Sequence, residues 1–218
     1  MTWIKICGTT SLEDALLSVE AGADALGFIF AESPRRIEPE RAREIIMELP
    51  ARIEKVGVFV DPALDYVRKV AQLTGITRIQ LYGDEQPGLL RAVEKNLPLR
   101  PITRAIGAGA HLRETLVALN GSGAMDSILL DSGSAAQRGG TGKVFDWKTA
   151  KEAIGQSGLN VRWIIAGGLK PENVGEAIRL FKPWGVDVVS GVESSPGKKD
   201  PGKLGKFVAA ARAAAEEI

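Results

Sequence analysis

The sequence has few of the residues that build cross-links or metal clusters. Cys7 is its one cysteine and His111 its one histidine, so it can form no internal disulfide and no cysteine/histidine metal site. No apolar run approaches the ~18–20 residues that span a bilayer, and the start lacks the basic and apolar regions of a signal peptide. Lys and Arg (28) nearly balance Asp and Glu (27), so no strong field attracts nucleic acid or anionic lipid. We therefore expect a cytoplasmic protein with no nucleic-acid or membrane partner.

What the sequence does have is a regular alternation of short β-rich runs with helical periodicity. Several runs are continuously apolar, as in parallel strands that are covered on both faces. Eight strands are predicted, at residues 3–7, 25–30, 55–60, 78–81, 100–105, 127–131, 162–166 and 185–190. No linker interrupts the pattern, so one domain over residues 1–218 is expected.

Eight such units favour an α/β fold, a single closed (β/α)8 TIM barrel. The alternative is an open doubly wound sheet, which usually has fewer strands and often a glycine-rich dinucleotide loop after the first one. The first turn here, Cys7-Gly8-Thr9-Thr10, lacks that loop. The barrel is therefore the predicted architecture.

Several helix boundaries are marked in the sequence. Ser11 with Asp14 resembles a capping box, Asp61 before a proline is expected to cap a helix, and Pro171 is expected to open one. The alanine-rich residues 208–218 are predicted to form the last helix.

Two residues at strand ends can transfer protons. Active sites of such barrels lie at the carboxyl ends of the strands, where Cys7 ends the first and Asp131 the sixth. A carboxylate at the mouth of an apolar strand is partly desolvated, which favours its protonated form and suits a general acid. Cys7 would have to be a thiolate, and a buried structural cysteine is the alternative. Lys5 lies on the same face of the strand, where it would either stabilise the thiolate or pair with an acid inside the barrel.

Glycines follow the last two strands, the usual place of a phosphate site in barrels. Gly168 belongs to a glycine pair after strand seven, and Ser190 and Gly191 follow strand eight. Glycine lets backbone N–H groups approach phosphate oxygens, although tight turns alone would also explain these residues. The segment 138–143, which contains Gly142, is expected to form a lid over the phosphate, and Gly142 is one of the predicted substrate-binding residues.

Two arginines, Arg35 and Arg36, follow Ser33-Pro34 in the loop after strand two. A guanidinium there could hold a carboxylate through two parallel hydrogen bonds. A solvated surface pair is the alternative for both.

These residues belong to six short sequence motifs. In chain order they are Lys5-Ile6-Cys7-Gly8, Ser33-Pro34-Arg35, Leu129-Leu130-Asp131, Gly139-Gly140-Thr141-Gly142-Lys143, Ala166-Gly167-Gly168-Leu169 and Ser190-Gly191-Val192-Glu193. In this combination the chain resembles the phosphoribosylanthranilate isomerase family of tryptophan biosynthesis, almost from end to end.

The resemblance implies an Amadori rearrangement of N-(5-phosphoribosyl)anthranilate to 1-(2-carboxyphenylamino)-1-deoxyribulose 5-phosphate. It implies that Asp131 is the general acid, Cys7 the general base, and Arg35 the ligand of the anthranilate carboxylate. Gly168, Ser190 and Gly191 would bind the phosphate. No cofactor or metal is implied, the partner is a phosphorylated small molecule, and the protein is a monomer or a homodimer.

Two residues depart from the family pattern. Tyr82 stands where the family commonly has histidine, and Val189 replaces a common serine; tyrosine cannot titrate near neutral pH. Among rivals, the histidine-pathway aminoaldose isomerase typically uses an aspartate where Cys7 stands. A phosphate-binding protein without turnover needs neither Cys7 nor Asp131, and a thiol redox protein lacks its second cysteine.

Overall fold

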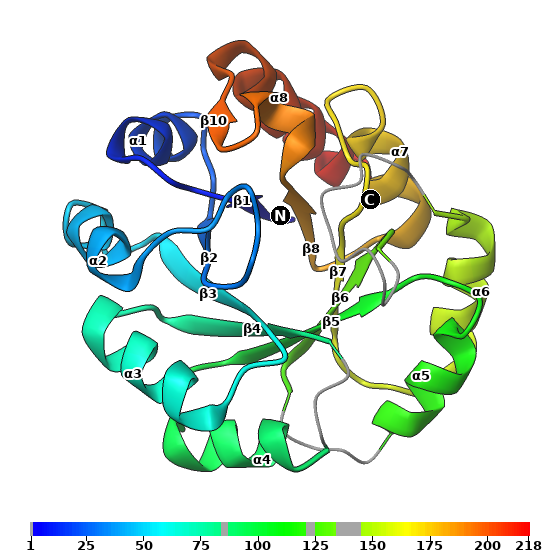
Figure 1. The fold of residues 1–218 in the computed structure, drawn as a ribbon. Helices are drawn as coiled ribbons and strands as arrows, with labels where there is room; N and C mark the ends of the chain where they lie inside the picture. Colours follow the sequence, from blue (N-terminus) through cyan, green and yellow to red (C-terminus); the bar gives the residue numbers. More distant parts are fainter. Residues whose placement is uncertain (1, 84–86, 121–124, 134–144) are drawn as a thin grey trace.

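The barrel predicted from the sequence is present in the structure, a computed structural model that describes residues 2–83, 87–120, 125–133 and 145–218. Within these residues eight parallel strands pair in chain order and close into a barrel (Figure 1). They are β1 Trp3–Cys7, β2 Ala25–Ile29, β3 Glu54–Val60, β4 Arg78–Tyr82, β5 Ile102–Gly107, β6 Ser127–Asp131, β7 Arg162–Ile165 and β8 Gly185–Val188.

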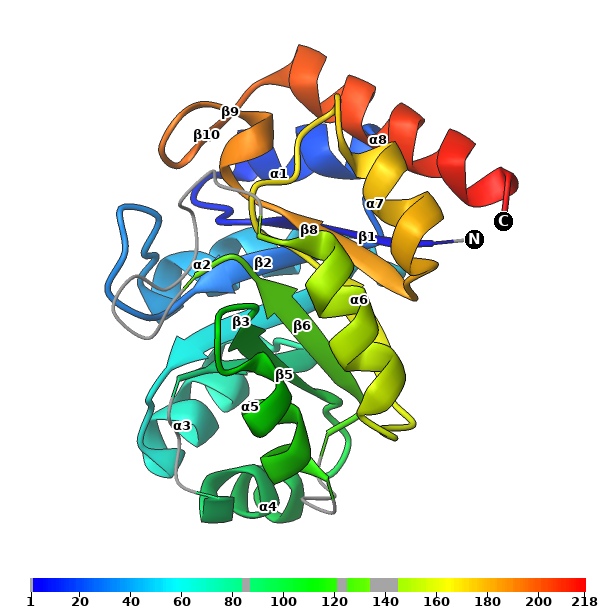
Figure 2. The same ribbon diagram turned by 90° about the vertical axis from the view of Figure 1, so that its right-hand side faces the viewer.

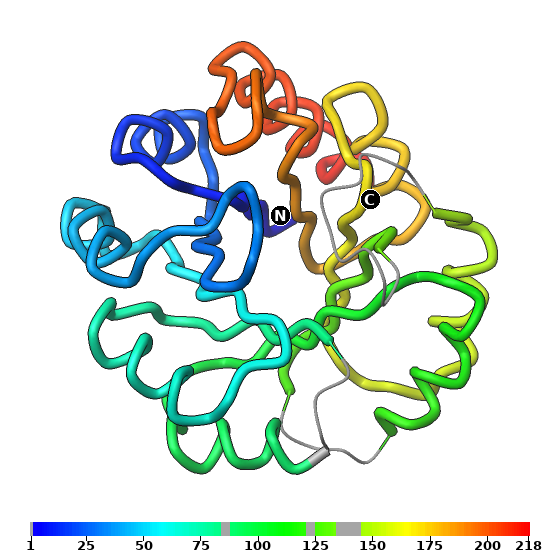
Figure 3. The backbone as a smooth tube through the Cα atoms, viewed as in Figure 1, coloured from blue at the N-terminus to red at the C-terminus, as the bar shows by residue number. Residues whose placement is uncertain are grey.

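Helices surround the barrel on its outside (Figure 1, Figure 2). They are α1 Leu12–Glu20, α2 Pro39–Met47, α3 Leu64–Thr74, α4 Pro87–Asn96, α5 Leu112–Leu119, α6 Trp147–Gln156, α7 Val174–Phe181 and α8 Pro201–Glu216. The chain passes once round the barrel, so the last helix, α8, packs beside the first, α1 (Figure 3). None of the helices among the described residues has the length and apolarity to cross a membrane.

The strands are buried on both faces, but the two faces differ in chemistry. In β1, Ile4 and Ile6 belong to the apolar layer under the helices. The alternate residues Lys5 and Cys7 are also buried, and they point the other way, into the barrel, because side chains alternate along a strand. The outer layer supplies most of the apolar core, and the barrel interior holds buried polar groups beside smaller apolar clusters.

The amino-terminal end of the barrel holds an ion-pair network beside two stacked rings. Arg78 bonds to Glu54 at 3.0 Å and to Asp126 at 2.5 Å. Its guanidinium lies 5.6 Å from the centre of the Trp184 ring, which stacks on Trp3 with a centroid distance of 4.8 Å. All five residues stand at or just before the first residue of a strand, so their network fixes the strands at the end away from the expected active site.

Three expected helix boundaries are wrong. Asp61 has a φ of 43°, a left-handed conformation unlike the extended one of an N-cap, and α3 begins three residues later. Pro171 opens a turn in which the carbonyl of Lys170 accepts N–H bonds, and α7 begins only after it. The last helix starts seven residues before position 208, because the Asp200 side chain caps it by accepting the N–H of residue 203 at 2.9 Å.

A hairpin that the sequence did not suggest follows β8. A short 3₁₀ helix, η1 Ser190–Val192, leads into the antiparallel strands β9 Glu193–Ser195 and β10 Lys198–Lys199. The Thr10 hydroxyl, just after β1, donates to the carbonyl of Gly197 at 2.7 Å. In Figure 2 this hairpin lies on the side of the molecule opposite the two termini. It is therefore held against the carboxyl end of β1.

Candidate active site

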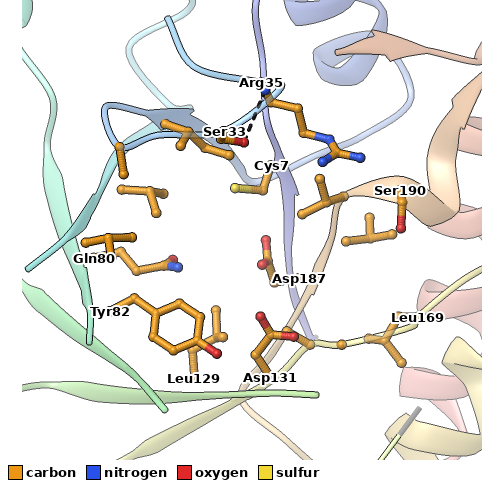
Figure 4. A pocket seen from close by; sticks show the side chains of 18 of the residues that line it. Cys7, Ser33, Arg35, Gln80, Tyr82, Leu129, Asp131, Leu169, Asp187 and Ser190 are labelled. Atoms are coloured by element: carbon orange, nitrogen blue, oxygen red, sulfur yellow. Dashed lines mark hydrogen bonds between the residues drawn. The ribbon is translucent and has the colours of Figure 1, made fainter. Parts of the chain in front are cut away.

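A pocket of about 180 Å³ opens at the carboxyl ends of the strands (Figure 4). It brings together residues that lie far apart in the sequence. Among those that line it are Cys7, Arg35, Tyr82, Asp131, Gly168, Asp187, Val189 and Ser190.

Cys7, the last residue of β1, is only 3% exposed. It pairs in register with Gly27 of β2, and a Cβ at Gly27 would lie 2.5 Å from the Cys7 sulfur. A glycine is therefore needed beside the thiol. Burial raises the pKa of Cys7, while the charges of Lys5 and Lys199 oppose that rise.

Lys5 lies beneath Cys7 and is fully buried. Its ammonium donates to Asp187 Oδ1 at 2.9 Å and to Gln80 Oε1 at 3.0 Å. Burial alone would lower the pKa of Lys5, but the charges of Asp187 and Cys7 raise it above its ordinary value. The ion pair with an acid inside the barrel is thus present. The same ammonium acts to lower the pKa of Cys7, and its stabilisation of a thiolate stays a prediction.

Asp131, the last residue of β6, is 7% exposed and points into the pocket (Figure 4). Burial raises its pKa, the neighbouring charge of Asp187 raises it further, and the N–H groups of Gly133 and Ser132 oppose both. A carboxyl group in this environment holds its proton to a higher pH than an exposed aspartate does.

The two arginines after β2 lie in different environments. Arg35 lines the pocket, and its guanidinium bonds to Glu193, with Nε 2.9 Å from Oε1 and Nη2 2.7 Å from Oε2. Arg36 points elsewhere, is about half exposed, and bonds to Glu38 at 3.0 Å. Of the pair, only Arg35 lines the pocket.

The glycine turns after β7 and β8 meet at the pocket. Gly168, with a φ of 70°, and Ser190 line it, whereas Gly191 is the next residue of η1 and does not. A Cβ at Gly191 would overlap the carbonyl of Leu169, so close packing of the two turns requires this glycine. The Asn173 amide holds the first turn by donating to the Gly168 carbonyl at 3.0 Å. Gly142 and the expected lid lie outside the described residues.

Asp187 and Gln80 were missed by the sequence reasoning. Both line the pocket, and both bond to Lys5. The signal available was a polar residue inside an otherwise apolar strand, as in the Gly-Val-Asp-Val of β8.

The pocket therefore combines a thiol, a carboxyl group with a raised pKa and a guanidinium. Such a set can move protons on a small anionic substrate. Within the described part of the chain, no three side chains of His, Cys, Asp or Glu gather as a metal site would require.

Comparison with known proteins gives one family. A family model described as N-(5'phosphoribosyl)anthranilate (PRA) isomerase matches residues 4–210. The N-(5'-phosphoribosyl)anthranilate isomerase of Citrifermentans bemidjiense is 47% identical over 213 residues, which is 97% of this chain and 98% of the relative.

Solved structures agree. The phosphoribosyl anthranilate isomerase of Thermotoga maritima superposes with a TM-score of 0.84 at 38% identity, over 98% of this chain and 100% of that one. A phosphoribosyl anthranilate isomerase in complex with reduced 1-(o-carboxyphenylamino)-1-deoxyribulose 5-phosphate gives 0.80 at 36% identity, with the same coverage. A further structure is of monomers generated from the dimeric Thermotoga maritima enzyme; it gives 0.80 at 39% identity, over 98% and 100% of the two chains. The chain therefore belongs to the N-(5'-phosphoribosyl)anthranilate isomerase family and is an isomerase.

Proposed function

We propose that this isomerase converts N-(5-phosphoribosyl)anthranilate to 1-(2-carboxyphenylamino)-1-deoxyribulose 5-phosphate, with Asp131 as general acid and Cys7 as general base. One observation carries the proposal: both groups line a single pocket, on different sides of it, together with Arg35 (Figure 4). The names of the relatives and the ligand held by one of them support the choice of substrate.

The first chemical step is opening of the ribose ring. Asp131 gives its proton to the ring oxygen as the bond from that oxygen to C1′ breaks, and the nitrogen lone pair forms a Schiff base. The raised pKa of Asp131 supports this role, because the group must hold a proton when the substrate arrives. The substrate's own nitrogen accepts the electron pair, so the proposed step uses no cofactor.

The second step is removal of the C2′ proton. The Cys7 thiolate takes that proton, and the electrons move toward nitrogen to give an enolamine. The enolamine tautomerises to the ketone by losing the proton of its C2′ hydroxyl and gaining one at C1′. A buried thiolate is costly. The charges of Lys5 and Lys199 offset part of that cost, although burial still leaves the pKa of Cys7 above its ordinary value.

The two anionic ends of the substrate would be bound by different kinds of group. Arg35 would bind the anthranilate carboxylate through its guanidinium. Gly168, Ser190 and Gly191 would bind the phosphate at the turns after β7 and β8, and Gly142 stays a predicted part of the lid. Tyr82, in place of the family histidine, lines the pocket at the end of β4 and can still donate a hydrogen bond there.

The test follows the fluorescence decay of freshly generated phosphoribosylanthranilate. We expect rapid decay with the wild type, none with Asp131→Asn, and a 10²–10⁴-fold lower kcat with Cys7→Ser, as for loss of a general acid or base. Asp65→Asn makes the same chemical change on the exposed surface of α3 and should leave the rate unchanged. Folded wild-type protein without turnover would favour the histidine-pathway aminoaldose isomerase or a phosphate-binding protein without turnover.

We further propose that residues 1–218 form one catalytic domain, which is supported by the family match over residues 4–210. Of the two expected oligomeric states, the homodimer is supported by the dimeric relative from Thermotoga maritima. The monomer stays a prediction from the sequence. The cytoplasmic location and the lack of a nucleic-acid partner stay predictions.

A further inference from the structure

The carboxylate of Glu193, at the start of the β9–β10 hairpin, lies between two cations. It accepts from Arg35 Nε at 2.9 Å and Nη2 at 2.7 Å on one side, and from Lys199 Nζ at 3.1 Å on the other. The side chains of Glu193 and Lys199 are 3% and 0% exposed. A carboxylate buried this deeply needs every partner it has, so the three side chains form a unit, called here the Arg35–Glu193–Lys199 triad.

The triad is tied to the backbone of the proposed base. Lys199 Nζ also donates to the carbonyl oxygen of Cys7 at 2.6 Å. The Arg35 side chain reaches Glu193 by crossing Gly8, where a Cβ would lie 2.8 Å from Arg35 Cδ. Gly8 has a φ of 78° and follows Cys7 directly. The β9–β10 hairpin thus contacts both the Arg35 guanidinium, through Glu193, and the backbone of Cys7, through Lys199.

The bonding pattern leaves part of the guanidinium for a ligand. Glu193 takes the Nε and Nη2 edge, and among the described residues Nη1 has no hydrogen-bond partner.

We propose that Glu193, held by Lys199, is a positioning residue that aims the Arg35 guanidinium at the carboxylate of the substrate. The inference rests on the proposed function, because it assigns the means by which that site recognises the anthranilate end. Glu193 acts through Arg35, so its loss affects substrate binding more than the chemical steps.

The test is Glu193→Gln, which keeps the shape of the side chain and removes its charge. We expect KM to rise about 10-fold or more, as when a binding group loses its alignment, with kcat within about threefold of the wild type. Binding is measured with two ligands: the reduced product analogue, 1-(o-carboxyphenylamino)-1-deoxyribulose 5-phosphate in reduced form, and the same compound without its carboxyl group. The Kd should rise only for the carboxylated ligand.

Two comparisons separate positioning from a merely structural role. In an Arg35→Met background, adding Glu193→Gln should change the Kd of the carboxylated ligand less than about twofold, because the group through which it acts is gone. Glu44→Gln removes the same charge from an exposed ion pair on α2 and should change nothing. Equal losses for both ligands, or a full additional loss in the Arg35→Met background, would overturn the inference.

Lys199→Met provides a second route if Glu193→Gln does not fold. It removes the cation that holds Glu193, and the preference for the carboxylated ligand should fall; an unchanged preference in a folded Lys199→Met protein would overturn the inference. Absence of wild-type turnover and of binding to either ligand would overturn the proposed function as well. Wild-type turnover with no change of ligand preference in the variants would overturn this inference alone.

Discussion

Gly27→Ala is the sharpest test of how the barrel holds its thiol. The new Cβ would lie 2.5 Å from Cys7 Sγ, 3.0 Å from Lys5 Cε and 3.1 Å from the backbone α-carbon of Cys7. Ordinary separations between such atoms are about 3.5–4.0 Å, so the sulfur must move by about 1 Å. Because the added carbon also lies too close to the Cys7 backbone, rotation of the Cys7 side chain alone cannot relieve the overlap.

The displacement sets the expected loss. A reacting group misplaced by about 1 Å costs about 10²-fold in rate, which corresponds to about 2.7 kcal/mol in the activation free energy. The free energy of unfolding should fall by about 1–3 kcal/mol, as in other overpacked cores. Turnover is followed by substrate fluorescence decay, and unfolding by urea titration of the circular dichroism signal.

Gly155→Ala is the matched control. Gly155 is an exposed residue of α6 with no atom within 4 Å of the added Cβ. Alanine there should raise the free energy of unfolding by about 0.5–1 kcal/mol through helix propensity, with an unchanged kcat. A folded Gly27→Ala protein with wild-type kcat and KM would refute the reasoning, since it would show that turnover does not depend on where the thiol lies.

Three further predictions concern charge. A plot of kcat/KM against pH should be bell-shaped, with the acid limb above 3.8 and the alkaline limb above 9.0, because burial raises the pKa of both Asp131 and Cys7. Below the lower pKa both groups carry protons and the base is lost, and above the upper pKa both are deprotonated and the acid is lost. An acid limb below 3.8 or an alkaline limb below 9.0 would contradict the assignment. Lys5→Met should lower the free energy of unfolding by about 3–5 kcal/mol in a urea titration, because it leaves the Asp187 carboxylate buried without its cation. Arg36→Ala should leave KM within about twofold in the fluorescence assay, and a larger rise would transfer the carboxylate contact to that residue.

The sequence predicted the barrel because its information is local and repeated. Each strand is a short apolar run bounded by turn residues. The structure places every strand start and end within two residues of the expected one, with β1 and β6 at the expected residues. Strand ends were also enough to bring Cys7 and Asp131 to one pocket. Which end of each strand matters follows from the parallel topology alone.

Helix starts were predicted less well, because a cap depends on backbone conformation as well as on residue type. Asp61 and Pro171 are suitable residues in unsuitable turns. In α1, Leu12, Ala15, Leu16 and Val19 recur at helical spacing, which predicts one buried stripe, but Leu16 is 46% exposed. Whether a given residue of an amphipathic helix faces solvent or a neighbouring element depends on how the helix is rotated about its axis on the barrel. Four apolar residues at helical spacing do not determine that rotation.

The partners of the charged groups could not be predicted, because they are set by closure of the barrel. Lys5 of β1 meets Asp187 of β8 and Gln80 of β4, which are 182 and 75 residues away along the chain. Strand pairing places Lys5 directly beside Asp187, since the first and last strands are neighbours only in a closed barrel. An open sheet made from the same strands would separate these two charges and leave each one buried alone, at a cost of several kcal/mol. The ion pair at the base of the pocket therefore favours the closed architecture over the open one, and the same pair sets the charge around the thiol and the carboxyl group on which the proposed reaction depends.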